Sequence, residues 1–255
     1  MLSIGIAAAA GPEVAARLAP VLERGGFHAL WVNDTPHADA LEVLAAAAAV
    51  TEHLVLATGV LPVDRRAAPE IAATVTRLGL PQERLVLGIG SGQLRAGALD
   101  AVGRAAEALR ETTAARVVVG ALGPRMRRLG VRTADGLLLS WLDPETAARQ
   151  TIAAHADAAN AHVALYVRAS VDPAADPRLR AETDRYAGFP SYAANFARLG
   201  LAPHATVIDS AADLGSAVAA YESVVDEVVL RAVTSADGPE AYVAFAEHVA
   251  AAVSE

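Results

Sequence analysis

The chain has 255 residues, enough to bury a sizeable core in one domain, and its formal net charge of −8 argues against a general nucleic-acid-binding surface. It has no cysteine, which excludes disulfides, thiolate catalysis and thiolate metal sites. All 21 basic residues are arginine, so a lysine Schiff base and a lysine phosphate anchor are excluded as well.

The hydrophobic content of 54% comes largely from alanine and does not indicate a membrane protein. The most apolar run, residues 41–50, contains Glu42 and is too short to cross a bilayer. The N-terminus carries no basic region before its small apolar segment, which argues against a secretory signal. We therefore expect a cytoplasmic protein with neither a membrane nor a nucleic-acid partner.

Short apolar runs alternate with amphipathic stretches along the chain, which is the pattern of strand-helix units. The runs expected to form strands are residues 3–8, 29–32, 54–58, 84–89, 116–120, 136–140, 162–169 and 227–233. The stretches expected to be helical are residues 12–24, 39–51, 98–112, 186–199 and 239–253, with further helices opening near Pro69, Pro124 and Pro144. Eight strand-helix units favour a closed (β/α)8 barrel over an open doubly wound sheet. No linker divides the chain, so we expect residues 1–255 to form a single domain.

Three consecutive strands within residues 25–92 end in small or polar residues. The three tips are Asn33-Asp34-Thr35, Thr58-Gly59-Val60 and Gly90-Ser91-Gly92. Such tips meet at the carboxyl face of a parallel sheet, where α/β proteins place ligands. From spacing alone, Asp34 is explained equally well as a contact to a polar heterocycle and as a turn cap before Pro36.

Two segments are rich in glycine. In residues 87–92 the glycines permit positive φ and let a ligand approach backbone N–H groups closely. In residues 119–126, Gly120 and Gly123 precede a helix that opens at Pro124. The free N–H groups and positive dipole end of such a helix stabilise an anion.

These segments, in this order, resemble the luciferase-like monooxygenase superfamily, and particularly its deazaflavin (coenzyme F420) branch. The resemblance is strongest over residues 25–92 and 116–142. It implies a (β/α)8 barrel, a homodimer, and an oxidoreductase that transfers hydride between coenzyme F420 and a small-molecule substrate. An FMN-dependent monooxygenase of the same superfamily and a non-catalytic cofactor-binding barrel are the alternatives.

The resemblance also implies site residues. In the deazaflavin branch an Asp-His pair stands at the second strand tip, and here Asp34 matches the Asp, Thr35 replaces the His, and His37 follows nearby. Gln93 stands where related dehydrogenases have an acidic proton donor, and a glutamine cannot donate a proton as an acid. The predicted catalytic residues are therefore Asp34, Gln93 and His37.

The predicted cofactor contacts follow the family's ring and phosphate segments. The family has a non-proline cis peptide behind the ring, and its match here lies between Gly59 and Val60. The residues predicted to bind the cofactor are Asp34, Gly59, Val60, Gly90, Ser91, Gly92, Gly120, Gly123 and Arg125. Larger members insert several tens of residues between Gln93 and Arg116, so the resemblance implies a shortened member with a more open pocket or one completed by a partner subunit.

Other residues are expected to have structural roles. Asp135 precedes a strand and is expected to be structural at the opposite face, and Trp141 is expected to pack in the core or rim. Tyr186, Tyr192 and Phe196 are at a spacing more often found in cores. Arg168 and Arg231 lie near strand ends, where they could bind an anionic cofactor tail or pair with acidic neighbours, and we expect the pairing. The seven histidines lack metal-site spacing.

Overall fold

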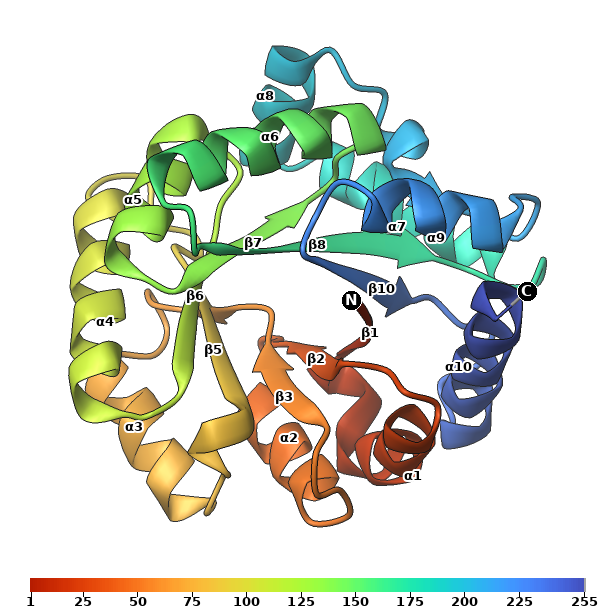
Figure 1. The fold of residues 1–255 in the computed structure, drawn as a ribbon, viewed down its shortest axis with the longest axis horizontal. Helices are drawn as coiled ribbons and strands as arrows, with labels where there is room; N and C mark the ends of the chain where they lie inside the picture. The colour runs from red at the N-terminus through yellow and green to blue at the C-terminus, as the bar shows by residue number, and fades with distance from the viewer. Residues whose placement is uncertain (255) are drawn as a thin grey trace.

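The computed structural model describes residues 1–254, in which parallel strands close into a barrel surrounded by helices (Figure 1). The strands are β1 (Leu2–Ala7), β2 (Ala29–Asn33), β3 (Val55–Thr58), β4 (Leu61–Pro62), β5 (Leu85–Gly90), β6 (Arg116–Gly120), β7 (Gly136–Ser140), β8 (His162–Ala169), β9 (Val207–Ile208) and β10 (Glu227–Ala232). The helices are α1 (Gly11–Arg24), α2 (Ala40–Ala48), α3 (Ala68–Arg77), α4 (Ala98–Thr112), α5 (Pro124–Thr133), α6 (Pro144–Asp157), α7 (Asp176–Ala187), α8 (Pro190–Leu199), α9 (Leu214–Glu222) and α10 (Pro239–Val253).

The barrel closes because its last strand pairs with two others. Strands β1, β2, β3, β5, β6, β7, β8 and β10 follow one another around it, and β10 pairs in parallel with both β8 and β1. In the closing pair, Leu2 lies opposite Val228. The short strands β4 and β9 extend the sheet beside β5 and β8. The predicted (β/α)8 barrel is confirmed.

Each predicted strand is present within a few residues of its expected bounds, but two helices were missed. The long connection after β8 holds α7 as well as α8, where the sequence predicted one helix over residues 186–199. Helix α9 was not predicted either, although Asp213 caps it and Leu214, Val218 and Tyr221 have helical spacing. No helix in residues 1–254 is both long and apolar enough to cross a membrane.

Side chains that alternate inward fill the centre of the barrel as a core separate from the one between strands and helices. This inner cluster consists of Ala29, Trp31, Ala57, Val86, Val118, Leu138, Ala164, Tyr166 and Val229. Trp31 and Tyr166 pack edge to face, with ring centroids 6.0 Å apart. The filled centre leaves the two ends of the barrel for polar groups.

At the amino-terminal end of the strands, Glu227 is 2% exposed and accepts three hydrogen bonds. The donors are Ser3 Oγ at 2.6 Å, Trp31 Nε1 at 2.6 Å and His162 Nε2 at 2.7 Å. Burial by itself would raise the pKa of Glu227, but these hydrogen bonds outweigh it and hold the pKa below its ordinary value. The carboxylate therefore ties β1, β2 and β8 to its own strand, β10, at the amino-terminal end of the barrel.

Asp135 also lies at this end, as predicted. Its Oδ2 accepts the Val117 N–H at 2.7 Å, and its Oδ1 lies 3.4 Å from the Arg110 guanidinium. These contacts fix the start of β7 against β6, so the structural interpretation of Asp135 is confirmed.

Candidate functional site

At the carboxyl end of the strands, the last inward-facing residue of each barrel strand contributes to a ring around the mouth. In chain order the ring is Ala7, Asn33, Gly59, which directly follows β3, Gly90, Gly120, Ser140, Arg168 and Arg231. Three neighbouring positions are glycine, and two neighbouring positions further around are arginine. The mouth therefore has a flat glycine side (Gly59, Gly90 and Gly120) and a charged arginine side (Arg168 and Arg231).

Val60 lies against the glycine side. A Cβ atom at Gly90 would lie 2.6 Å from Val60 Cγ2, and one at Gly120 would lie 2.9 Å from Val60 Cγ1. The peptide bond between Gly59 and Val60 is cis, which confirms that prediction. The structure thus brings together four of the residues predicted to bind the cofactor, and only glycine leaves room for this packing.

Asn33 joins the second strand tip to this surface. Its side-chain amide donates to the Gly59 carbonyl, while its Oδ1 is buried and has no hydrogen-bond partner within residues 1–254. A buried acceptor without a partner is unfavourable unless a ligand or water supplies a donor. Asn33 was not among the residues predicted to bind the cofactor, although it belongs to the second strand tip.

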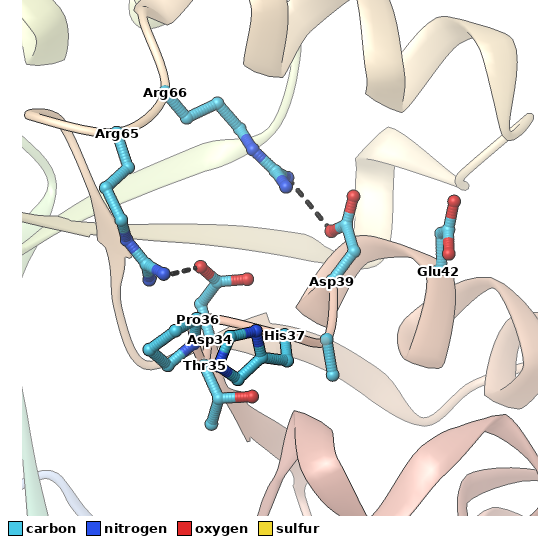
Figure 2. Close-up of a pocket in the computed structure, with 9 residues that line it drawn as sticks. Asp34, Thr35, Pro36, His37, Asp39, Glu42, Arg65 and Arg66 are labelled. Carbon is cyan, nitrogen blue, oxygen red and sulfur yellow. Dashed lines mark hydrogen bonds and ion pairs between the residues drawn. The ribbon is translucent and has the colours of Figure 1, made fainter.

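Asp34 lines a pocket of about 440 Å³ beside the mouth (Figure 2). Its side chain is 6% exposed; Oδ2 accepts from Arg65 Nη2 at 2.8 Å and Oδ1 from the Ala40 N–H at 3.1 Å. Burial is the largest influence on this carboxyl and raises its pKa above the ordinary value, although Ala40, Arg66 and Arg65 each oppose that shift. Asp34 is therefore a turn cap and also the buried partner of an ion pair.

The rest of this pocket is polar. Arg66 pairs with Asp39 at 2.9 Å, and the exposed His37 stands near Asp34 in Figure 2. The lining residues are Asp34, Thr35, Pro36, His37, Ala38, Asp39, Glu42, Arg65 and Arg66. Two of the three predicted catalytic residues, Asp34 and His37, thus share one pocket.

Gln93 lies on the exposed loop that follows β5. Asp64 Oδ2 accepts the Gln93 N–H at 2.7 Å, and a Cβ atom at Gly92 would overlap the same carboxylate. Gly92 has a φ of +58°, so glycine is required there for both conformation and space. Asp64 was not predicted, and it fixes the backbone of this loop while the Gln93 side chain stays exposed and Ser91 half-buried.

The start of α5 forms an arginine-rich corner. Gly123 caps the helix without a side-chain hydrogen bond, and within residues 1–254 no atom beyond Gly123 and its two chain neighbours lies within 4 Å of where its Cβ would be. Arg127 Nη1 and Arg198 Nη2 both donate to the Leu122 carbonyl, at 2.8 Å and 3.2 Å. Burial, with the nearby Arg198 and Arg128, lowers the pKa of Arg127.

The predicted Arg125 lies exposed in the first turn of α5, while Arg127 and Arg198 converge on the Leu122 carbonyl. Arg198 comes from α8, 76 residues beyond Leu122, and no local pattern in the sequence indicates that it reaches this corner. An anion here would meet several positive groups and the helix N-terminus together.

On the arginine side, both arginines pair with one carboxylate. Arg168 Nε lies 3.3 Å from Glu182 Oε1, and Arg231 Nη2 lies 3.7 Å from Glu182 Oε2. Trp141 packs beside them, 1% exposed. The expected acidic partner and the expected packing of Trp141 are both confirmed, and Glu182 is the partner that the sequence did not identify.

Together, the closed parallel barrel and the polar, glycine-rich mouth define a (β/α)8-barrel protein with a candidate ligand site at the carboxyl face. The family model described as luciferase-like monooxygenase matches residues 3–112. This part of the chain, from β1 through α4, is therefore similar to the luciferase-like monooxygenase family, in agreement with the resemblance seen in the sequence.

Solved structures share the fold over nearly the whole chain. An F420-dependent secondary alcohol dehydrogenase in complex with an F420-acetone adduct is 15% identical, with a TM-score of 0.72 and 98% of both chains covered. The coenzyme F420-dependent tetrahydromethanopterin reductase from Methanopyrus kandleri is 17% identical, with a TM-score of 0.66, covering 97% of this chain and 98% of that one.

An FMN complex is also similar. The oxygenating constituent of 3,6-diketocamphane monooxygenase from Pseudomonas putida is 13% identical, with a TM-score of 0.68, covering 99% of this chain and 98% of that one. Identities this low establish the fold and leave the cofactor open. A comparison with curated proteins finds no match.

Proposed function

We propose that the protein is an oxidoreductase that binds the deazaflavin coenzyme F420 and transfers hydride between it and a small organic substrate. One observation carries the proposal: the glycine side of the mouth lies beside the arginine-rich start of α5. The first is a surface that a flat ring can approach, and the second stabilises a phosphate. A coenzyme with a planar ring and an anionic tail has this combination of groups.

The chemistry of the residues present fits such a coenzyme. Asn33 Oδ1 is a buried acceptor without a partner, suited to a ring N–H. Gly90 and Gly120 leave a surface beside Val60 that side chains would block. Arg127 and Arg198, with the open N-terminus at Gly123, provide donors for a phosphate.

When bound, the deazaflavin would supply a ring carbon that accepts or gives hydride. The contribution of the chain would be mainly to position ring and substrate. Asp34 would orient the ring from its pocket. Gln93 would offer a hydrogen bond but no acidic proton, so a proton would have to come from His37 or from water.

The proposal is tested by titrating the purified protein with coenzyme F420 and, separately, with FMN, following fluorescence. We expect coenzyme F420 to bind more tightly. Arg127→Gln is expected to weaken this binding by about tenfold, the equivalent of one charge-assisted hydrogen bond. Arg132→Gln, an exposed change in the last turn of the same helix, is the matched control and should leave the affinity unchanged.

The alternative is an FMN-dependent monooxygenase, which the similar FMN complex supports. The same arginine corner would accept the FMN phosphate. Tighter binding of FMN, or a yellow flavin that co-purifies with the protein, would favour this alternative. Binding of a coenzyme without any turnover would favour the non-catalytic cofactor-binding barrel, and failure to bind either coenzyme would overturn the proposal.

Asp34→Ala is expected to weaken coenzyme binding by about 1 to 3 kcal/mol, the usual cost of removing one partner from a hydrogen bond to a charged group. Asp34→Asn removes the negative charge but keeps an acceptor for the Ala40 N–H. It therefore distinguishes the role of Asp34 as a turn cap from the role of its charge. The measurements are the same titration and a thermal melt of each variant. If both variants bind the coenzyme as the wild type does, Asp34 serves only as a turn cap and the partner of Arg65.

A further inference from the structure

The arginine side of the mouth carries more positive than negative charge. Arg168 and Arg231 are direct cross-strand partners on β8 and β10, and like charges in that position repel each other. Their side chains are only 5% and 13% exposed. Within residues 1–254, Glu182 is the one carboxylate within ion-pair distance of either arginine, so the cluster keeps an excess positive charge.

The same region has more hydrogen-bond donors than acceptors. Arg168 also donates to Ser140 Oγ at 2.7 Å, and Arg231 donates to the Ala232 carbonyl. Trp141 Nε1 beside Arg168 is buried and has no hydrogen-bond partner in the described part of the chain. Guanidinium and indole groups can only donate, so the group missing here is an acceptor.

Aromatic rings surround this charge. The guanidinium carbon of Arg168 lies 4.0 Å from the Trp141 ring centroid and 4.8 Å from that of Tyr186. Tyr186 in turn packs against Tyr192 at 5.0 Å and against Phe189, which is 45% exposed. The charged cluster thus connects to a partly exposed aromatic surface formed by α7 and α8.

We propose that the arginine side binds the carboxylate of a planar organic acid, with Arg168 and Arg231 as its partners and the Tyr186 and Phe189 rings against its apolar body. The Glu182 carboxylate occupies this place in the free protein, and the acid replaces it. The assignment of this acid as the substrate rests on the proposed function, because the acid lies beside a coenzyme ring only if the protein binds that coenzyme.

Glu182 is well placed to occupy the anion site when no organic acid is bound. It comes from α7, outside the barrel strands, so an outward movement of one side chain releases both arginines without changing the sheet. Burial by itself would raise the pKa of Glu182, but Arg231 and Arg168 outweigh burial and hold the pKa below its ordinary value. The site therefore holds an ionised carboxylate at neutral pH, which is the form in which an organic acid would arrive.

The experiment uses the coenzyme-free protein and benzoate as the probe, with benzamide as its neutral counterpart of the same shape, measured by calorimetry. We expect benzoate to bind at least about tenfold more tightly than benzamide, because only the carboxylate forms charge-assisted hydrogen bonds. Trp141 fluorescence provides a second readout, and Trp141→Phe distinguishes its signal from that of Trp31.

Two variants test the assigned residues. Glu182→Gln removes the competing charge and is expected to tighten benzoate binding, while Arg231→Gln is expected to weaken it by about tenfold or more. Arg178→Gln is the matched control, because Arg178 lies on the same helix but pairs with the exposed Asp237 and should leave benzoate binding unchanged. Each variant is checked by a thermal melt, and the comparison of benzoate with benzamide on the wild type stands even if a variant fails to fold.

Equal affinity for benzoate and benzamide, no benzoate binding at millimolar concentration, or unchanged binding in a folded Arg231→Gln would overturn the proposal. The coenzyme titration gives a separate answer. Benzoate binding without coenzyme binding would leave the anion site in place and remove the oxidoreductase proposal. Coenzyme binding without benzoate binding would remove only the anion site.

Discussion

Replacing Glu227 with alanine is expected to lower the free energy of unfolding by about 3 to 5 kcal/mol, the range observed when one partner of a buried charged network is removed. The carboxylate accepts from Ser3, Trp31 and His162 at 2.6 to 2.7 Å, and the change leaves all three donors without a partner inside the barrel. Urea denaturation followed by tryptophan fluorescence measures the loss.

Glu227→Gln keeps the shape and one acceptor, so it should cost less than alanine. The pH dependence has a defined sign: the folded-state pKa of Glu227 lies below its ordinary value, so its stabilising contribution is present above the unfolded-state pKa. The gap between wild type and Glu227→Ala should therefore shrink as the pH falls below about 4. A loss under about 1 kcal/mol at neutral pH, an ordinary value for any substitution, would show that the network is unimportant for stability.

Gly90→Ala is expected to reduce coenzyme affinity by about a hundredfold, close to 2.7 kcal/mol. The new Cβ would lie 2.6 Å from Val60 Cγ2, so the Val60 side chain must move on the surface where the ring is proposed to lie. The fluorescence titration measures the affinity, and circular dichroism shows whether the variant is folded.

The double variant Val60→Ala with Gly90→Ala should recover much of this binding, because the smaller side chain removes the clash. Gly103→Ala is the matched control: its Cβ would meet Leu129 at an ordinary 3.4 Å, far along α4 from the mouth. If folded Gly90→Ala binds the coenzyme normally, the ring does not lie on the glycine side.

The barrel and the glycine side could be predicted because their signals are local. Buried strands read as apolar runs, and the tips that contain Gly59 and Gly90 directly follow two of them. Helix α7 was missed for a physical reason: its buried positions are only Leu179 and Thr183. A helix that covers a polar mouth has no apolar stripe for periodicity to detect.

The charged partners could not be predicted from the sequence because they depend on strand register and on distant helices. The alignment of Arg168 with Arg231 follows from the pairing of β8 with β10. Glu182 and Arg198 reach the mouth from α7 and α8, whose orientation is set by packing. The roles assigned to Asp34, His37 and Gln93 stay predictions until a ligand is measured.

The closing pair between β1 and β10 has a consequence for how the protein is made. β1 meets its second neighbour only when residues near 228 exist, so a growing chain carries an open parallel edge on each side of its unfinished sheet. Unpaired edges invite pairing with other chains, and contacts this distant in sequence form slowly. The last strand to leave the ribosome is thus the one that removes both edges, and a chain cut short before it keeps them exposed.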